Sequence, residues 1–230
     1  DAMFAVYAFC REVDDIADGE SSPDEKRALL DKWRRDIDAL YAGGEVVSDS
    51  PVLRALAVAI SRYALEQMDF IEIIAGMEMD TDGSMIVPDC ERLQLYCDRV
   101  AGAVGLLSIR IFGDSGEAAR EFALSLGTAL QLTNILRDLK DDAGMDRLYL
   151  PREQFDRFGV PMAPPKEMLE HPKLPEICAS LAERAREKYA EAESMLEAVN
   201  SSNTVNYLNH NYRRCPAIVL AKKMISEGKL

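Results

Sequence analysis

The placement of proline restricts the fold of this chain more than any other feature of its sequence. Six of the ten prolines lie between residues 143 and 175, while Pro23, Pro51 and Pro88 each precede a long segment without proline. Because proline is tolerated in the first turn of a helix and interrupts a helix further in, this distribution marks helix starts and one loop-rich region. Apolar residues recur at helical spacing between these marks, which predicts an all-α chain.

The expected elements follow from these proline positions and from the helical spacing of the apolar residues. The segment 80–88 is rich in turn residues and is expected to hold a short hairpin, and residues 143–175 are expected to be mostly loop. Met68, Met77, Met79 and Leu107 are expected in the core. We predict one all-α domain of about eight helices over residues 1–230. The expected helices are 2–18, 23–41, 51–66, 68–79, 90–112, 117–142, 177–199 and 204–227, the last interrupted by Pro216.

Composition narrows the classes of function. The chain is 48% hydrophobic, enough for a sizeable core, and its formal net charge is −13. That charge argues against nucleic acid as a partner and against attachment to an anionic membrane face. It leaves room for an anionic substrate if metal ions reverse the local field. The five cysteines form no CxxC pair, so we expect reduced thiols in a cytoplasmic protein.

The first polar cluster lies near the end of the first expected helix. Asp14 and Asp18 are four residues apart and therefore share one helix face, about 6 Å apart along the axis. The same stripe reads Phe4, Tyr7, Arg11, Asp14 and Asp18, so an apolar stripe becomes ionic at one end.

The second polar cluster lies in an otherwise apolar helix. Gln131, Asn134, Asp138 and Asp142 share one stripe, and leucine and isoleucine surround them. The alternative for both clusters is a solvated helix face. Two properties of the clusters favour function instead: like charges at i,i+4 cost a few tenths of a kcal/mol, and aspartate is a poor helix former.

Every candidate ligand in these clusters offers oxygen. Oxygen donors suit Mg²⁺, which takes one or two carboxylates and completes its shell with water and substrate phosphates. The only histidines, His171 and His210, belong to no ExxH or HExxH pattern, so a di-iron or zinc site is not expected. Neither a P-loop nor a dinucleotide fingerprint is present, so phosphate would be bound by metal and basic side chains.

Three motifs in this order resemble the squalene and phytoene synthases. The two aspartate-rich motifs of that family are similar to residues 14–18 (DDIAD) and 138–142 (DLKDD). A third family signature is similar to residues 96–105 (YCDRVAGAVG). The family has the isoprenoid synthase fold, a single helical bundle around a central cavity with the two motifs facing each other. The resemblance covers residues 2–155 well and the remainder loosely.

Within the family, residues 5–14, 96–100 and 107–113 are most similar to the bacterial presqualene diphosphate synthases of hopanoid biosynthesis. This similarity implies a prenyltransferase that joins two farnesyl diphosphates head to head with Mg²⁺ or Mn²⁺ and without NADPH. The alternatives are a phytoene or dehydrosqualene synthase, a terpene cyclase on the same fold, and a catalytically silent assembly subunit. Substrate chain length (C15 or C20), product and oligomeric state stay open.

The resemblance also assigns the metal ligands. Asp14 and Asp18 would hold Mg²⁺ from one wall of the cavity, and Asn134, Asp138 and Asp142 would hold it from the other. The metal would neutralise the diphosphate leaving group as the allylic substrate ionises.

Three arginines are candidates for contacts to diphosphate, since guanidinium matches phosphate geometry. They are Arg11, which is also a candidate catalytic residue, Arg137 and Arg147. For Arg11 and Arg137 the alternative is an ion pair that orients the aspartates. For Arg147 the choice is between a lid over the diphosphates and an ordinary exposed loop arginine.

Tyr96 would stabilise a carbocation through its ring or bind diphosphate through its hydroxyl; an ordinary core tyrosine is the alternative. Gln131 is a further candidate catalytic residue, which would serve the second diphosphate or a nearby water. Tyr212 is a further candidate for diphosphate binding. The small residues within 101–105 either open space for a prenyl chain or allow close helix packing.

The family has a further N-terminal segment that lines the substrate tunnel, and the present sequence opens inside the first recognisable helix. We therefore expect residues upstream of Asp1 to raise activity. A lipophilic product makes peripheral contact with a membrane an open alternative to a purely cytoplasmic location.

Overall fold

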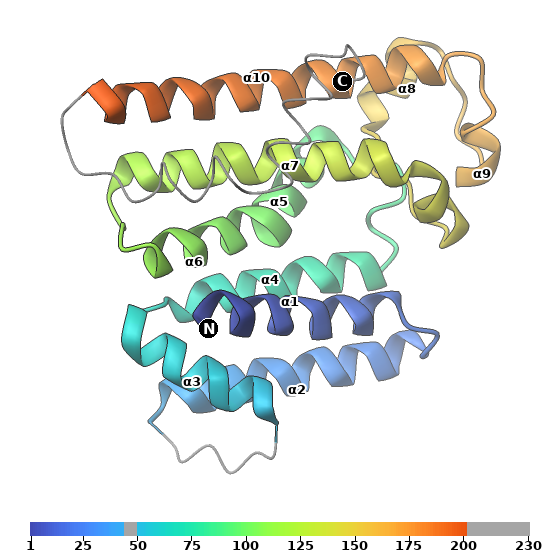
Figure 1. Ribbon diagram of the computed structural model, residues 1–230. Coiled ribbons are helices and arrows are strands. Elements are labelled where there is room, and N and C mark those ends of the chain that lie inside the picture. The colour runs from blue at the N-terminus through green and yellow to red at the C-terminus, as the bar shows by residue number, and fades with distance from the viewer. Residues whose placement is uncertain (44–49, 202–230) are drawn as a thin grey trace.

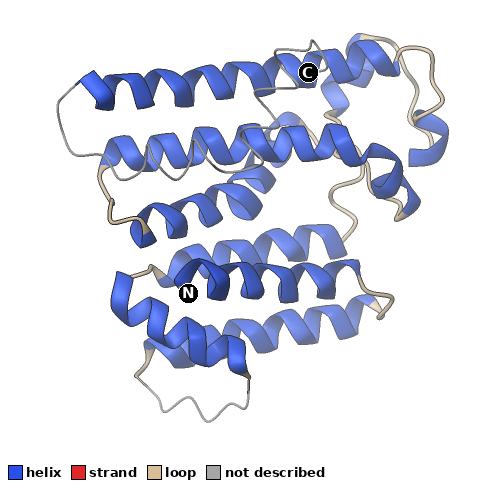
Figure 2. Ribbon diagram, in the orientation of Figure 1, coloured by secondary structure: helices blue, strands red, loops and turns tan. Residues whose placement is uncertain are grey.

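A computed structural model describes residues 1–43 and 50–201 of the chain (Figure 1). These residues form helices joined by loops and include no strand (Figure 2), which confirms the all-α prediction. The predicted helix 204–227 lies outside the described residues. The elements are α1 (Ala2–Asp18), α2 (Pro23–Tyr41), α3 (Pro51–Tyr63), α4 (Gln67–Thr81), α5 (Cys90–Cys97), the π-helix η1 (Asp98–Gly102), α6 (Ala103–Ile111), α7 (Glu117–Gly144), α8 (Arg152–Arg157), α9 (Pro165–Met168) and α10 (Leu174–Ser201).

The helices begin where short polar side chains cap them. Ser22 accepts a hydrogen bond from the backbone of Glu25, and the Glu25 carboxylate accepts one from the Ser22 backbone. Ser50 and Asp89 cap α3 and α5 in the same way, with one side-chain bond each. Each cap satisfies N–H groups that have no partner within the helix, which fixes the start of the element.

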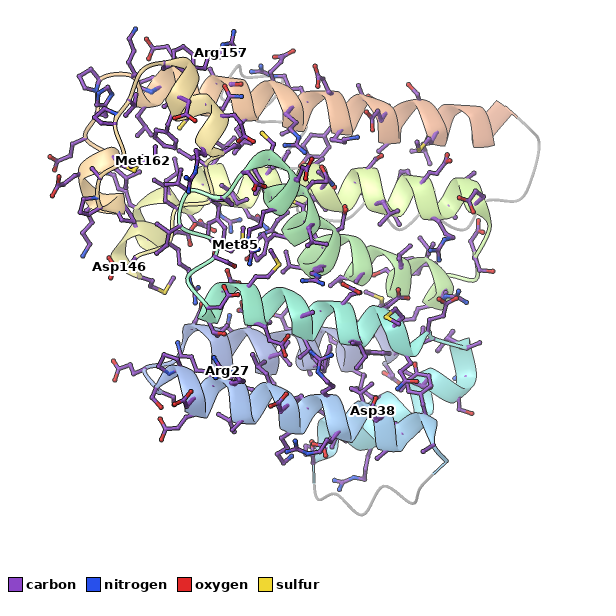
Figure 3. All side chains as sticks on the ribbon, turned by 180° about the vertical axis from the view of Figure 1, so that it is seen from behind. Arg27, Asp38, Met85, Asp146, Arg157 and Met162 are labelled. Carbon is purple, nitrogen blue, oxygen red and sulfur yellow. The ribbon has the colours of Figure 1, made fainter. Side chains whose placement is uncertain are left out.

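Figure 1 shows α1 to α4 as one group of helices and α5, α6, α7 and α10 as another, and the buried apolar residues form three clusters. In the first group, α1 to α4, the Phe9 ring makes edge contacts with Trp33 and Phe70 at 5.3 Å between centroids. In the second group, α5, α7 and α10 pack together with the segment 148–169. Figure 3 shows Met85 inside the molecule, and it is 1% exposed. Of the methionines expected in the core, Met68 is 60% exposed, so that expectation was wrong for this residue.

The predicted helix 90–112 contains one wider turn, η1, at its middle. Close packing surrounds this turn: a Cβ on Gly127 would lie 2.9 Å from the backbone of Ala101, and a Cβ on Gly105 would lie 2.9 Å from the carbonyl oxygen of Ala123. A Cβ on Gly76 would lie 2.5 Å from the Val100 side chain. The glycines of 101–105 are therefore explained by close helix packing, which holds η1 between α4 and α7.

The predicted hairpin at 80–88 does not form. This segment instead pairs with residue 148: the Val87 backbone N–H donates to the Leu148 carbonyl at 2.7 Å, and the Leu148 N–H donates to the Met85 carbonyl. The sequence distance between the partners explains why local turn signals misplaced the pairing. As a result, the chain around Arg147 is fastened to the end of α4.

Three helices, α1, α4 and α7, end at the same side of the molecule (Figure 1). The C-terminus of a helix carries a partial negative charge, and a basic residue in the last turn ordinarily offsets it. None of these three helices has a basic residue in its last turn. This end of the molecule therefore concentrates negative potential. Separately, none of the helices in the described ranges is long and apolar enough to cross a membrane.

Candidate active site

A cleft of about 240 Å³ opens between α1 and α7. Four of the predicted site residues line it: Arg11 and Asp14 from α1, Tyr96 from α5 and Gln131 from α7. The rest of its lining is mostly apolar and comes from α1, α4 and η1. These lining residues are Tyr7, Cys10, Ile73, Met77 and Val100. A lining that combines ionic and apolar groups suits an amphiphilic substrate such as a prenyl diphosphate.

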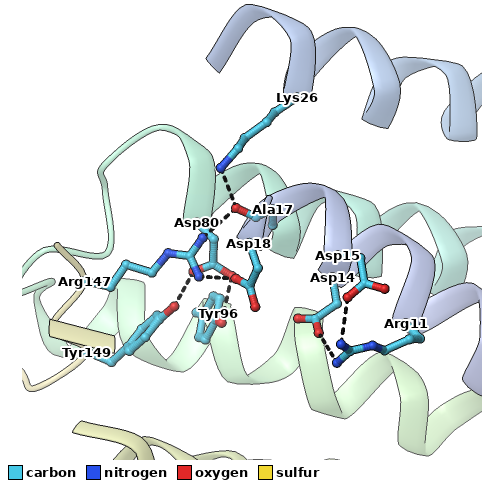
Figure 4. Close-up of polar contacts among 10 residues, drawn as sticks. All are labelled: Arg11, Asp14, Asp15, Ala17, Asp18, Lys26, Asp80, Tyr96, Arg147 and Tyr149. Carbon is cyan, nitrogen blue, oxygen red and sulfur yellow. Dashed lines mark hydrogen bonds and ion pairs between the residues drawn. The ribbon is translucent and has the colours of Figure 1, made fainter. Parts of the chain in front are cut away.

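The first aspartate motif lies on the last two turns of α1. Arg11 pairs with Asp14 at 3.4 Å and with Asp15 at 2.8 Å, so one cation serves two carboxylates (Figure 4). Burial raises the pKa of Asp14 above its ordinary value, and the neighbouring Asp18 raises it further. Arg11 thus forms ion pairs with the motif and also lines the cleft, so both alternatives considered for it stay open.

The second motif lies on the last turns of α7. The Arg137 guanidinium donates two hydrogen bonds to the Asp138 carboxylate, at 2.7 and 2.6 Å. Asp142 lacks an ion pair with any lysine or arginine of the described residues. Burial, followed by the charge of Asp138, raises the pKa of Asp142 to about 7. Asn134, partly buried, lies one turn before Asp138.

Arg147 joins the two sides of the site. Its Nη1 donates to Asp18 at 2.5 Å and its Nη2 donates to the Ala17 carbonyl at 2.8 Å (Figure 4). Lys26 donates to the same carbonyl at 2.8 Å, so two cations meet the end of α1. The Arg147 side chain is 11% exposed. It is therefore not an ordinary exposed loop arginine, because it fills the acidic end of the site.

Sequence analysis missed Asp80, which lies in the last turn of α4. Two tyrosine hydroxyls donate to its carboxylate, Tyr96 at 2.9 Å and Tyr149 at 2.7 Å. The two rings stack, with 5.1 Å between centroids and 24° between planes. Burial raises the pKa of Asp80 to about 6. Tyr96 is 5% exposed and is also among the residues that line the cleft, so its role stays a prediction.

The donor chemistry of the site fits Mg²⁺. The candidate ligands are oxygens, and burial raises the pKa of Asp14 and of Asp142, with neighbouring carboxylates adding to the rise. Among the described residues no three His, Cys, Asp or Glu side chains converge closely enough to hold a metal by themselves. Waters and diphosphate oxygens would have to complete the shell, as is usual for Mg²⁺.

The remaining predicted residues lie outside the cleft itself. Asp18, Arg137, Asp138 and Asp142 are not among its lining residues in the described part of the chain. Asp142 nevertheless lies within the electrostatic reach of Asp18, Asp80 and Arg147, so both motifs contribute to one field. Tyr212 lies outside the described residues. The ligand set therefore stays a prediction.

Comparison with known proteins places these features in a family. Residues 1–221 match the sequence profile described as squalene/phytoene synthase. The chain is 43% identical over 196 residues to a presqualene diphosphate synthase of Sinorhizobium fredii, covering 85% of this chain and 69% of that protein. It is 46% identical over 197 residues to the enzyme of that name from Zymomonas mobilis, covering 85% and 66%. The chain thus spans about two thirds of the length of these relatives.

The fold agrees with the sequence comparison. A crystal structure of a dehydrosqualene synthase in complex with a ligand superposes with a TM-score of 0.72 at 34% sequence identity. The match covers 85% of this chain and 67% of the other. It confirms the predicted isoprenoid synthase fold. The chain belongs to the squalene/phytoene synthase family.

Proposed function

We propose that this protein condenses two molecules of farnesyl diphosphate head to head, giving presqualene diphosphate and releasing diphosphate. It would act in hopanoid or squalene biosynthesis, as a prenyltransferase that needs Mg²⁺ and no NADPH. The family membership supports the reaction class, and the names of the relatives support the product.

One observation carries the proposal: Arg11, Asp14 and Gln131 share a cleft with the ring of Tyr96 and with an apolar wall. A prenyl diphosphate needs both environments at once, polar for its head and apolar for its tail. The buried Ile73 and Met77 supply the apolar wall next to the ionic residues. An apolar wall also excludes water, which would otherwise quench a carbocation.

The residues that would hold Mg²⁺ are Asp14, Asp18, Asn134, Asp138 and Asp142. Bound Mg²⁺ supplies neutralisation of the charge that develops on the leaving diphosphate. Arg11, Arg137 and Arg147 already neutralise aspartates of the two motifs. They would share their hydrogen-bond donors with diphosphate oxygens when substrate enters, because each guanidinium has five donors.

The protein's own side chains would guide the bond changes. The C1–O bond of one substrate breaks, and diphosphate leaves with the electron pair. The double bond of the second substrate then attacks the allylic cation, and loss of a proton from the new carbon–carbon junction closes the cyclopropane. Tyr96 lines the cleft where its ring would face the cation.

Mass spectrometry of the products tests this proposal. Purified protein is incubated with Mg²⁺ and farnesyl diphosphate, with and without NADPH, and in parallel with the C20 diphosphate. We expect presqualene diphosphate from the C15 substrate, unchanged by NADPH. Phytoene from the C20 substrate would favour the phytoene synthase alternative. Four results would contradict the proposal. They are dehydrosqualene formed without NADPH, squalene formed only with NADPH, a product made from a single diphosphate, and no turnover by folded wild-type protein.

The proposal includes a cytoplasmic location with peripheral contact to a membrane. Its support is chemical: the four cysteines among the described residues have free thiols, and the proposed product is lipophilic. Fractionation of cells tests it. If the protein is recovered in the membrane fraction and high salt does not release it, the contact is not peripheral.

A further inference from the structure

Asp80 occupies a costly position that the proposed reaction has not yet explained. A carboxylate in the last turn of a helix faces the negative end of the helix dipole, and Asp80 is also partly buried. The nearby charge of Arg147 and two hydrogen bonds, from Tyr149 and from Tyr96, stabilise the ionised carboxylate. Since apolar residues of similar size would avoid this cost, the arrangement points to a role for the carboxylate.

The hydrogen bonds determine how Tyr96 can act. An ionised carboxylate only accepts hydrogen bonds, so both tyrosine hydroxyls must direct their hydrogens toward Asp80 (Figure 4). While that bond holds, the Tyr96 hydroxyl has no hydrogen left for a diphosphate oxygen. Of the two roles considered for Tyr96, this leaves stabilisation of a cation by the ring.

Asp80 is placed beside Tyr96 rather than in the lining of the cleft. It is not among the cleft-lining residues of the described chain, whereas Tyr96 is. Stacking on Tyr149 at 5.1 Å between centroids restricts the plane of the Tyr96 ring, and the hydrogen bond to the carboxylate holds the hydroxyl end of the ring in place. A phenol that donates to a carboxylate also gains electron density in its ring, and chains of such bonds reinforce one another at low dielectric.

We propose that Asp80 is a positioning residue for the condensation: it holds the stacked pair Tyr96 and Tyr149 as hydrogen-bond donors, so that an electron-rich Tyr96 ring faces the allylic cation. The inference rests on the proposed function. It assigns to Asp80 no contact with substrate or metal, and it predicts that every kinetic effect of Asp80 passes through the tyrosine pair.

A double-mutant cycle tests this dependence, with Asp80→Asn, Tyr96→Phe and the combined variant. Asparagine keeps one acceptor oxygen but presents a donor in place of the other, so one tyrosine must turn its hydroxyl. We expect Asp80→Asn to lower kcat about 100-fold, the scale on which small misplacements act, while KM changes little. In the Tyr96→Phe background the same change should have little further effect, because coupled residues are not additive.

Asp69→Asn is the matched control. Asp69 is another aspartate of α4, 5% exposed, in the first turn of the helix, at the opposite end from Asp80, and it is not among the described residues that line the cleft. Its replacement should leave kcat unchanged. Each variant is also melted with Mg²⁺ and a diphosphate analogue, and the Asp80→Asn variant should keep the ligand-induced rise in Tm. Two results would overturn the proposal. One is the loss of the ligand-induced rise in Tm in Asp80→Asn. The other is a double variant whose fall in kcat equals the product of the falls in the two single variants.

Raman spectroscopy separates this inference from the proposed function. The tyrosine Fermi doublet reports whether a hydroxyl donates or accepts a hydrogen bond, without any turnover. We expect Asp80→Asn to shift the doublet away from strong donation, and Asp69→Asn to leave it unchanged. An unchanged doublet in Asp80→Asn would refute the arrangement. A shifted doublet in a protein that turns over no prenyl diphosphate would instead refute the proposed function, and with it the catalytic purpose of the arrangement.

Discussion

Replacing Asp142 by Asn should stabilise the metal-free protein while abolishing its activity. The pKa of Asp142 rises from 3.8 to about 7 in the fold, with burial as the main cause and Asp138 as the next. At about 1.4 kcal/mol for each pKa unit, this rise corresponds to about 4 kcal/mol. Solvent screens a partly exposed carboxylate, so we expect about 1–2 kcal/mol in practice.

The sign of the effect follows from which state holds the proton more tightly. The folded protein keeps Asp142 protonated up to a higher pH than the unfolded chain does. The stabilising contribution is therefore complete below pH 3.8 and is lost as the pH rises to about 7. Asparagine resembles the protonated carboxyl, so the variant should be more stable than the wild type at pH 8 and equal to it near pH 4.

Thermal melts in EDTA measure this difference. For a chain of this size, 1–2 kcal/mol corresponds to a rise in Tm of about 2–8 °C at pH 8. With Mg²⁺ and a diphosphate analogue the order should reverse, because the wild type gains binding free energy that the variant loses. Turnover should fall by several orders of magnitude. The exposed neighbour provides the control: Asp141→Asn should change stability by no more than about 0.5 kcal/mol.

Two results would refute the reasoning. If Asp142→Asn is less stable than the wild type at pH 8 without metal, the carboxylate is held by favourable contacts and is not an uncompensated charge. If the variant keeps normal turnover and normal stabilisation by Mg²⁺ with the analogue, Asp142 is not a metal ligand. If the variant gains as much Tm at pH 4 as at pH 8, its stabilisation does not come from the titration of Asp142.

Three further predictions concern the metal, the helix packing and the acidic end of the site. Activity should require Mg²⁺ or Mn²⁺ and vanish with EDTA; full turnover in excess chelator would exclude the metal role. Gly105→Ala should lower the free energy of unfolding in urea by about 1–3 kcal/mol, since its Cβ meets the Ala123 carbonyl, whereas Gly144→Ala, with open space around it, should hold or slightly raise it. Arg147→Gln should weaken binding of a diphosphate analogue in calorimetry and lower apo stability by about 1–2 kcal/mol; unchanged values for both would contradict its assignment.

The helices could be predicted from the sequence because their limits are local. Proline, glycine and capping residues act within a few positions, and α1 begins and ends at the residues expected. The two aspartate motifs were visible for the same reason, since each repeats along one face of a single helix. The π-helix η1 was not predictable, because it depends on how closely α4 and α7 approach it at Gly76 and Gly127.

Contacts between distant segments explain what sequence analysis missed. Asp80 is one aspartate without a repeating pattern, and its partner tyrosines are 16 and 69 residues away. The ion pair of Arg147 with Asp18 spans 129 residues. A local pattern carries no information about such pairs. The segment pairing at Leu148, which brings Arg147 and Tyr149 to the end of α4, was for the same reason mistaken for a hairpin.

The convergence of helix ends gives these separate contacts one physical cause. Asp18, Asp80 and Asp142 each lie in the last turn of a helix, where the dipole opposes a negative charge. Bringing three such ends together adds mutual repulsion, which reaches Asp142 from both of the others. Two of the three aspartates have direct partners: Arg147 pairs with Asp18, and two tyrosine hydroxyls donate to Asp80. Asp142 has no ion pair with a lysine or arginine of the described residues and is influenced by Arg147 only through its nearby charge. We therefore expect a divalent ion to neutralise Asp142, and this expectation rests on where the three helices end as well as on the two motifs.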